Sequence, residues 1–322
     1  MSILGIHHIA LVSSDAERTS DYLTRILGLR LLATPESGGS GGHYYFGSEE
    51  GTPGSIVSVE EQPGARPGHE GVGGTHHYAL LVETRDALLQ WKRWLVDNGI
   101  AVSGPLDRHY FESIYHRDPD GQVVEIATRG HGWTRDEEPE SIGTEQRVPP
   151  AEMVKGNRDA ERIRLETWPE PVEAITPGMR FRRMHHITAI GRDIQQLHRF
   201  LHDAMGMRRV KRTSNFDMPD SFHWYWGVGD GEPGTVVTYF ERKDVSPVRP
   251  GPGQASHYAL AVADEDGLRE IGDRLRAAGY EVSDIEERTW YRCISTHDPD
   301  GQRVEIATLG PGFTSADSEE RS

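Results

Sequence analysis

The feature that most constrains this chain is a duplication. The eleven residues DPDGQVVEIAT, which begin at Asp118, return at Asp298 with one change, Val123 to Arg303. Other pairs of segments match at nearly the same spacing of 178 to 180 residues: IHHIALV with MHHITAI, GTPGSIVSV with GEPGTVVTY, and HYALLVE with HYALAVA. Collinear matches at one spacing do not arise by chance, so the sequence predicts one unit written twice.

Each half of the duplication divides again into two similar quarters. A strand-like run at 7–12 precedes residues 15–29, whose apolar side chains recur at helical spacing as far as Gly28. Alternating segments separated by turn residues then predict several strands. The second quarter repeats this order, with a helix predicted over 85–99. We therefore expect an α+β fold of four strand–helix–strands modules that begin near residues 5, 74, 182 and 254.

The same pattern predicts the domain organisation. Residues 1–145 hold the first pair of modules, and residues 181–322 hold the second pair. Between them, residues 146–180 are rich in Glu, Pro and Arg, which is typical of a connector. One short helix is expected in the connector, around Asp159 to Glu166.

Composition excludes several classes of partner. The 322 residues carry a formal charge of −16, which argues against nucleic acid or an anionic membrane surface. No apolar run is long enough to cross a bilayer, and the N-terminal residues lack the pattern of a signal peptide. Cys293 is the only cysteine, so no disulfide can form within the chain. We therefore expect a cytoplasmic protein, and the sequence leaves its oligomeric state open, a homo-oligomer included.

Six residues at repeated positions have the chemistry of metal ligands. A histidine opens the first strand of each quarter, and a glutamate lies between Val and Ile on the last strand of the second and fourth quarters: His8, His77, His186 and His257, with Glu125 and Glu305. A carboxylate on a buried strand is costly unless it is paired or bound to metal. Two imidazoles and one carboxylate form the triad suited to non-heme Fe(II) oxygenases, with Mn(II) as a plausible substitute. The alternative, a salt bridge from each glutamate to an arginine, explains two equivalent positions less well.

The modules resemble the vicinal oxygen chelate superfamily, which holds glyoxalases, bleomycin resistance proteins and extradiol dioxygenases. The resemblance rests on the strand-opening histidine and the DPDGxxVE ending. It is closer to hydroquinone and chlorohydroquinone ring-cleaving dioxygenases over DRHYFESIYHRDPDGQVVEIAT (107–128) and over the stretch from MHHITAI to GEPGTVVTYF (184–240). It implies four βαβββ modules that form two cupped, barrel-like mixed sheets.

The resemblance also implies roles for individual residues. It makes His186, His77 and Glu125 the metal ligands of one site. It places three further residues around that site, where they would orient the bound phenol and move its protons: His185, Arg108 and Tyr115. Strict alternation along a strand sends His185 away from the face of His186, so either a β-bulge or a structural role is needed for it.

Two ways of pairing the quarters remain open from the residues alone. Pairing within each half combines His8 and His77 with Glu125. Pairing of the two middle quarters combines His77, His186 and Glu125, and leaves His8, His257 and Glu305 for an outer site. We favour the pairing of the middle quarters, because it assembles Arg108 and Tyr115 around one complete site. Both schemes predict two potential metal sites.

One position separates the reaction classes within the superfamily. Glyoxalase-type lyases use a fourth ligand, a carboxylate on the closing strand of the first unit, and alignment places Ser58 and Thr238 there. Three protein ligands leave room for substrate and O2, so we expect a metal-dependent extradiol-type dioxygenase that acts on a hydroquinone or another dihydroxy-aromatic compound. The alternatives are a glyoxalase-like metal lyase or isomerase, and a non-catalytic small-molecule-binding protein of the resistance type.

Overall fold

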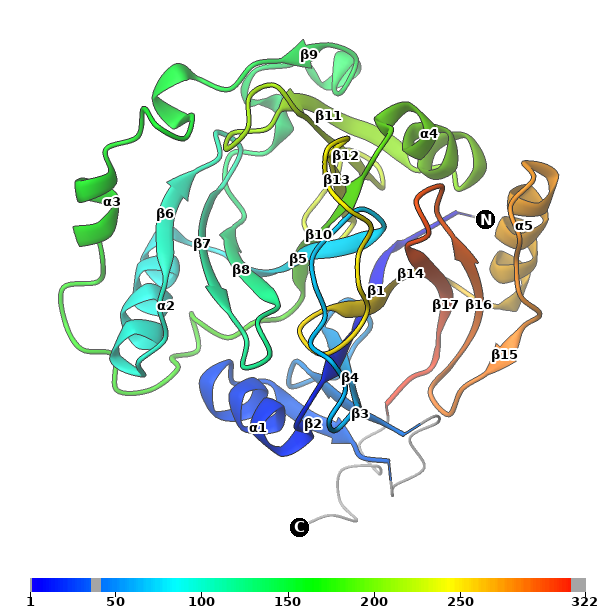
Figure 1. Cartoon of the computed structure of the whole chain (residues 1–322), viewed down its shortest axis with the longest axis horizontal. Helices are drawn as coiled ribbons and strands as arrows, with labels where there is room; N and C mark the ends of the chain where they lie inside the picture. The colour runs from blue at the N-terminus through cyan, green and yellow to red at the C-terminus, as the bar shows by residue number, and fades with distance from the viewer. Residues whose placement is uncertain (1, 36–41, 314–322) are drawn as a thin grey trace.

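The computed structural model describes residues 2–35 and 42–313, so residues 1, 36–41 and 314–322 of the two predicted halves lie outside the described part. Two curled mixed sheets lie side by side (Figure 1). The strand order of the nine-stranded sheet is β6 (Ser103–Asp107), β7 (Glu112–Arg117), β8 (Val123–Thr128), β5 (Gly74–Val82), β10 (Met184–Gly191), β13 (Val236–Glu241), β12 (Phe222–Gly227), β11 (Arg208–Ser214) and β9 (Gln146–Arg147). The order of the eight-stranded sheet is β15 (Glu286–Glu287), β16 (Tyr291–His297), β17 (Arg303–Pro311), β14 (Ala255–Val262), β1 (Gly5–Ser13), β4 (Ile56–Glu61), β3 (His43–Gly47) and β2 (Arg30–Ala33).

The sheets combine the second quarter with the third and the first with the fourth, which is the pairing favoured from the sequence. β5 pairs antiparallel with β10, which joins the second and third quarters in the nine-stranded sheet. β1 pairs antiparallel with β14, which joins the first and fourth quarters in the eight-stranded sheet. The pairing of the middle quarters is therefore confirmed. Each sheet takes one quarter from each half. The ranges 1–145, 146–180 and 181–322 therefore describe the repeat in the sequence. Their use as domain boundaries stays a prediction.

The helices lie where apolar periodicity predicts them. The 85–99 pattern forms α2 (Arg85–Asp97), whose N-cap Thr84 accepts a hydrogen bond from the amide of Ala87. Its counterpart in the last quarter is α5 (Glu265–Ala277). In the first and third quarters the helix begins as α and continues as π-helix: α1 (Ala16–Asp21) with η1 (Tyr22–Ile26), and α4 (Ile194–His198) with η5 (Arg199–Ala204).

The apolar core joins both sheets to their helices. One cluster of buried side chains includes Trp91 of α2, Leu275 of α5, and Tyr78 and Tyr258 from the two central strand pairs. Figure 1 shows α2 and α5 at opposite ends of the molecule, each beside the sheet that its own quarter helps to form. The strands that carry the histidines (β1, β5, β10 and β14) each pair with a neighbour on both edges, so the sheets hold them in place as well. Within the described residues, no helix is long and apolar enough to span a membrane.

The connector is ordered and reaches both neighbouring modules. It contains β9, the 3₁₀ segment η4 (Ala151–Met153) and α3 (Ala160–Leu165), and another 3₁₀ segment, η3 (Pro139–Ser141), lies just before it. The N-cap of α3 is Asp159 and its C-cap is Glu166, as predicted for the connector helix. β9 adds a parallel edge to β11, so the connector extends the nine-stranded sheet.

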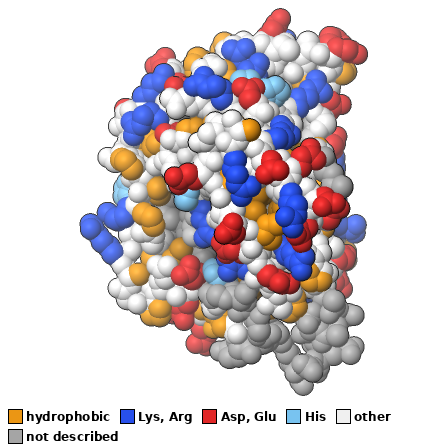
Figure 2. All heavy atoms as spheres, turned by 90° about the vertical axis from the view of Figure 1, so that its right-hand side faces the viewer, with side chains coloured by type: hydrophobic (Ala, Val, Ile, Leu, Met, Phe, Trp, Pro, Cys, Tyr) orange, Lys and Arg blue, Asp and Glu red, His pale blue; other side chains and the backbone are white. Residues whose placement is uncertain are grey.

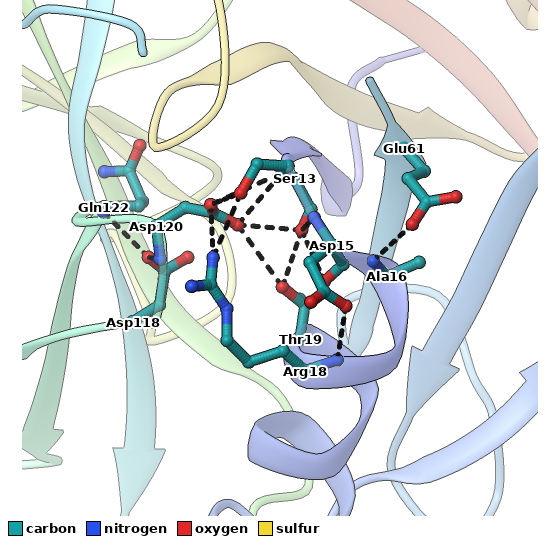
Figure 3. A network of polar contacts seen from close by, with 10 residues as sticks. Ser13, Asp15, Ala16, Arg18, Thr19, Glu61, Asp118, Asp120 and Gln122 are labelled. Carbon is teal, nitrogen blue, oxygen red and sulfur yellow. Dashed lines mark hydrogen bonds and ion pairs between the residues drawn. The ribbon is translucent and has the colours of Figure 1, made fainter. Parts of the chain in front are cut away.

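The repeated DPDG turns fasten one sheet to the other. In the first turn, Asp118 Oδ1 accepts hydrogen bonds from the amides of Asp120 (3.0 Å) and Gln122 (2.8 Å). Asp120 then reaches the beginning of α1, where its carboxylate accepts hydrogen bonds from Ser13 Oγ and Arg18 Nη2, both at 2.7 Å (Figure 3). In the second turn, the carboxylate of Asp300 accepts a hydrogen bond from the backbone amide at Arg192 (2.8 Å), just before α4. The repetition of the motif therefore serves a turn and a contact between sheets.

The first aspartate of each turn makes stability depend on pH. Burial raises the pKa of both Asp118 and Asp298 to about 7. Since the folded-state pKa lies above the ordinary value, their contribution to stability is complete at low pH and is lost as pH rises through about 7. Between about pH 4 and pH 7 the free energy of unfolding should fall by up to about 1.4 kcal/mol per pH unit for each carboxyl, and this slope should vanish above about pH 7, where both states are ionised. Urea unfolding of the Asp118→Asn/Asp298→Asn protein should show a flatter pH profile, whereas Asp273→Asn, an exposed control, should keep the original slope.

A buried lysine joins the two middle modules. Lys211 of β11 is fully buried, and its Nζ donates to Asp136 Oδ1 (2.7 Å), to the carbonyl of Trp133 (3.2 Å) and to Glu137. Trp133 opens the short helix η2 (Trp133–Arg135) that follows β8, and its Nε1 donates to the carbonyl of Gly231 (2.9 Å). The segment after β8 that holds Trp133, Asp136 and Glu137 is therefore joined to the third quarter through Lys211 and Gly231.

Removing this lysine should destabilise the fold. Lys211→Met leaves the buried Glu137 carboxylate without its cation, which typically costs about 3–5 kcal/mol. Arg208→Gln on the same strand breaks an exposed pair with Asp230 and should cost less than about 1 kcal/mol. Urea denaturation of both variants measures the difference. Equal midpoints would show that the buried cluster contributes nothing to holding the modules together.

Candidate metal centre and cavity

The nine-stranded sheet brings three of the predicted ligands together. His77, His186 and Glu125 lie on β5, β10 and β8, which are neighbours in the sheet, and all three side chains are buried. The distance from Nε2 of His77 to Oε2 of Glu125 is 2.8 Å, and the distance from Nε2 of His186 to the same oxygen is 3.4 Å. The two Nε2 atoms are 3.2 Å apart. We call this group the inner triad.

The eight-stranded sheet repeats the arrangement with the other three residues. His8, His257 and Glu305 are buried on β1, β14 and β17. Nε2 of His8 lies 3.3 Å from Nε2 of His257, and Oε2 of Glu305 lies 3.9 Å and 3.4 Å from these two nitrogens. We call this group the outer triad. In each triad, the three ligand atoms lie within 4.8 Å of one another.

In each triad the glutamate and one of the histidines have the protonation states that a cation needs. Burial lowers the pKa of His77 to about 3 and holds that of His8 well below its ordinary value, so these imidazoles are neutral at pH 7. Burial alone would raise the pKa of Glu125, but the facing His186 and His77 hold it well below its ordinary range. The pKa of Glu305 is lowered in the same way by His257 and His8. Each triad therefore presents a carboxylate and a neutral imidazole, that of His77 in the inner triad and that of His8 in the outer triad.

Neighbouring side chains fix which nitrogen of each imidazole faces the centre. In the outer triad, His7 Nε2 lies 3.1 Å from the carbonyl oxygen of Thr308. Because a carbonyl only accepts, that nitrogen carries the hydrogen, and His7 Nδ1 accepts from Nδ1 of His8 at 2.8 Å. The lone pair of His8 then lies on Nε2, which faces Glu305. This tautomer follows from the hydrogen-bond network.

The same support recurs at the other three histidines. Nδ1 of His77 lies 2.6 Å from Nδ1 of His76, and Nδ1 of His257 lies 3.1 Å from Ser256 Oγ. Nδ1 of His186 lies 2.8 Å from Nδ1 of His185. In every case the partner is the preceding residue of the strand.

The buried carboxylate oxygens test whether a cation fits. Oε2 of Glu125 and Oε2 of Glu305 are buried, and neither has a hydrogen-bond partner among the described residues, although imidazole nitrogens lie close to both. Such an orphaned oxygen is costly in a folded protein. The other oxygen of Glu125 accepts a hydrogen bond from Ser113 Oγ. One oxygen is therefore oriented by the protein while the other faces the Nε2 atoms of two imidazoles, an arrangement that fits a divalent metal.

His185 lies behind its neighbour and outside the lining of the cavity. The pairing of β10 with β5 is irregular between Met184 and His186, which is where the sequence required a bulge. His185 packs against the ring of Phe111, with centroids 4.7 Å apart. The contact with His186 Nδ1 indicates a positioning role, and a direct catalytic role for His185 stays a prediction.

A cavity of about 520 Å³ opens onto the inner triad. Arg108 and Tyr115 line it, and Arg108 Nε donates a hydrogen bond to the hydroxyl oxygen of Tyr115 (3.1 Å). Besides Tyr115, its aromatic lining includes Phe111, Phe216, Tyr225 and Phe240, together with the rings of His76 and His223. His223 of β12 is buried and belongs to the cavity lining.

Sequence reasoning missed several residues of this cavity. Asp217 accepts hydrogen bonds from Arg108 Nη1 (3.0 Å) and from Arg158 Nη1 (2.7 Å), so it holds both guanidinium groups. Arg158 and Lys155 belong to the connector, whose composition predicted only a linker. The signal for Asp217 was present, because it lies in the SNFD stretch that carries the family resemblance. Ser113, which holds Glu125 and lies outside the cavity lining, also falls in a stretch that carries the resemblance (107–128), but it received no role from the sequence.

The surroundings of the outer triad differ at equivalent positions. Ser295 stands in place of Tyr115, and Cys293 stands in place of Ser113. Arg303, in place of Val123, donates to Oε1 of Glu305 at 2.7 Å. The outer triad keeps the three ligands, but its carboxylate is held by an arginine and the tyrosine is absent from that position.

The strand register shows what occupies the fourth-ligand position. Glu125 of β8 is in register with Ala79, two residues after His77. On β13, Thr238 is in register with Thr188, two residues after His186. On β4, Ser58 takes the corresponding place. The alignment made from the sequence is confirmed, and neither side chain is a carboxylate.

The comparison with known families agrees with this architecture. The model of the Glyoxalase/Bleomycin resistance protein/Dioxygenase superfamily matches residues 5–126 and 183–306. The chain belongs to this superfamily. The fold class expected from the resemblance is therefore confirmed.

Relatives that match nearly the whole chain bear dioxygenase names. The "Putative ring-cleaving dioxygenase MhqA" of Bacillus subtilis (strain 168) is 25% identical over 97% of this chain and 89% of its own length. The chlorohydroquinone/hydroquinone 1,2-dioxygenase of Sphingobium indicum is 23% identical over 98% of this chain and 88% of its own length. These activities are those of the relatives.

Solved structures share the fold. A "putative dioxygenase" from Bacillus subtilis subsp. subtilis str. 168 superposes with a TM-score of 0.75 at 22% identity, over 99% of this chain and 89% of that one. Glyoxalase I from Zea mays superposes with a TM-score of 0.62 at 15% identity, over 98% of this chain and 94% of that one. At these identities the likeness concerns the fold alone.

Metal titration separates the two triads. Wild-type protein loaded anaerobically with Fe(II) or Mn(II) should bind about two ions per chain, His77→Ala or His257→Ala about one, and the double variant none, because each substitution removes one of three ligands. Elemental analysis after desalting measures the stoichiometry. His131→Ala, which removes an exposed histidine, should leave it unchanged. An unaltered metal content in the double variant would contradict the assignment of both triads.

Proposed function

We propose that this protein is a metal-dependent extradiol-type dioxygenase that opens the ring of a hydroquinone or another dihydroxy-aromatic compound at the inner triad. The observation that carries the proposal is a two-histidine, one-glutamate ligand set at the base of an aromatic-lined cavity that also contains Arg108 and Tyr115. The names of the full-length relatives support it. The substrates are the aromatic diol and O2.

The inner triad would hold Fe(II), and Mn(II) has overlapping preferences. When bound, the metal would supply Lewis acidity toward the phenol and a route for electrons to O2. The residues of the chain have separate tasks. His77, His186 and Glu125 supply one face of ligands, and Ser113 orients the carboxylate by donating to its other oxygen. His185 supports His186 from behind.

Arg108 and Tyr115 are suited to hold a substrate oxygen. Burial raises the pKa of the Tyr115 hydroxyl, and although the cation of Arg108 opposes this, the hydroxyl stays protonated at neutral pH. Its oxygen accepts a hydrogen bond from Arg108, so its hydrogen is available for donation. Burial disfavours the charged form of Arg108, but Tyr115, Asp217 and Glu125 keep its pKa raised and the guanidinium charged. A phenolate oxygen placed beside this pair would be oriented and could receive a proton.

The cavity wall favours a flat ring and excludes bulk water from one side. Phe111, Tyr225 and Phe240 are aromatic, and His223 is held by Thr238 Oγ1 (2.8 Å) and by the hydroxyl of Tyr225 (2.8 Å). Aromatic rings stack or meet edge to face with such side chains. A fixed wall positions the ring before it reacts.

The alternatives are less well supported. A glyoxalase-like lyase needs a carboxylate at the position of Thr238, whose hydroxyl instead bonds to Thr188 (2.9 Å) and His223. A non-catalytic binding protein has no need for two buried ligand sets. At the outer triad we propose a metal site without the ring-opening role, because Ser295 replaces the tyrosine there.

Cellular location stays a prediction. Cys293, the only cysteine, is buried, and burial raises the pKa of its thiol to about 12, which makes it unreactive. A reducing compartment such as the cytoplasm remains the proposed setting.

Oxygen uptake tests the proposed reaction. Protein loaded with Fe(II) under argon should consume O2 when hydroquinone, chlorohydroquinone or catechol is added, and the product should lose the ultraviolet band of the ring. Tyr115→Phe should lower kcat by about 10²-fold, because it removes the proton donor beside the substrate. Ser295→Ala, the equivalent change at the outer triad, should leave kcat unchanged.

Two results would count against this proposal. One is the absence of uptake with every diol in iron-replete protein. The other is isomerisation of a glutathione–methylglyoxal adduct by the same preparation, which would favour the lyase.

A further inference from the structure

The inner cavity is rich in cations within an acidic protein. The chain has a formal charge of −16. Five cationic side chains nevertheless line the cavity, against two carboxylates, Glu125 and Asp217: Arg108, Arg117, Lys155, Arg158 and Arg242. On the face that carries α5, by contrast, both acidic and basic side chains are spread over the surface (Figure 2).

The carboxylates of the cavity do not balance these cations. Asp217 is shared between Arg108 and Arg158, so one negative charge faces two guanidinium groups. Glu125 faces His77 and His186, and a bound metal would neutralise its charge. The wall of the cavity therefore keeps a net positive charge.

Three of the cations lie toward solvent at the mouth of the cavity. Lys155 is exposed and makes no ion pair with any residue that the structure describes. Arg117, also exposed, donates to the carbonyl of Gly121 and faces no carboxylate within the described ranges. Arg242 is half-buried, and its Nε lies 3.4 Å from Asp244, whose side chain is 75% exposed. These three groups remain available to an anion.

We infer that the natural substrate is a dihydroxy-aromatic carboxylate, with the carboxylate held by Lys155, Arg117 and Arg242 at the cavity mouth. This inference rests on the proposed function and names its substrate class. A neutral hydroquinone leaves these cations uncompensated, whereas a carboxylate accepts hydrogen bonds from both guanidinium and ammonium groups. A cleft of one sign of charge also raises the local concentration of an oppositely charged substrate.

The size of the cavity is compatible with this class. About 520 Å³ lies within the range of small-molecule sites, and it holds a single ring with a short acidic substituent. The aromatic wall contacts the ring, the inner triad faces the hydroxyl, and the cations face the substituent. One small molecule can satisfy all three parts of the lining.

Substrate comparison tests the inference. Oxygen uptake by the Fe(II)-loaded protein should be measured with hydroquinone and with 2,5-dihydroxybenzoate or 2,5-dihydroxyphenylacetate, at low and high salt. At low salt, one of the two acids should have a kcat/KM about tenfold or more above that of hydroquinone, and the advantage should shrink with salt. Lys155→Gln should reduce this ratio about five- to tenfold, mainly through KM. Lys243→Gln, a lysine outside the cavity lining, should leave the ratio unchanged.

The outcomes separate this inference from the proposed function. Uptake with hydroquinone that equals or exceeds uptake with both acids at every salt concentration overturns the inference and keeps the dioxygenase. If no diol is turned over, calorimetric binding of 2,5-dihydroxybenzoate and hydroquinone to the same protein decides it. Tighter binding of the acid, weakened by Lys155→Gln and not by Lys243→Gln, then supports the anion site without the reaction. Equal binding overturns it.

Discussion

A carboxylate buried between two imidazoles is the interaction on which the rest of this molecule depends. Val and Ile flank Glu125 and Glu305 along their strands, and both carboxylates are buried. Burial of a carboxylate is unfavourable unless its charge is compensated. In each sheet the two histidine-bearing strands are adjacent, so that two imidazoles face the carboxylate. The preceding residue of the strand contacts the Nδ1 atom of each imidazole and holds it in place. Fold and candidate chemistry therefore share one requirement, which is that three strands from two modules meet in a fixed register.

Much of this could be predicted because the duplication repeats both the ligands and their spacing. Position along each repeat identified His8, His77, His186 and His257 as equivalent, and helical and alternating patterns located the modules. The place of Thr238 at the fourth-ligand position followed from the same alignment, and the strand register agrees with it. The choice of partner quarters could be argued only from the completeness of one site, because strand periodicity does not say which strands meet.

Other features depend on contacts between distant residues, which a local pattern does not encode. The irregular pairing near His185 allows it to contact its neighbour, and alternation alone pointed it elsewhere. Arg158 reaches Asp217 across 59 positions of sequence, from a segment whose composition suggested only a linker. The π-helical turn after α1 was predicted as ordinary helix, since apolar spacing alone does not distinguish the two.

The exchange of quarters between the halves has a consequence for how the chain reaches its native state. β1 and β14 are separated by more than 240 residues, yet they are adjacent in the eight-stranded sheet. During synthesis the first quarter emerges long before its partner, so its inner strand edge waits unpaired until almost the whole polypeptide has left the ribosome. Contacts of such long range slow folding, and until they form the unpaired strand edges are exposed to aggregation. If the gene were cut between the two halves, each histidine-bearing strand would keep the neighbour from its own half and lose the neighbour from the other half.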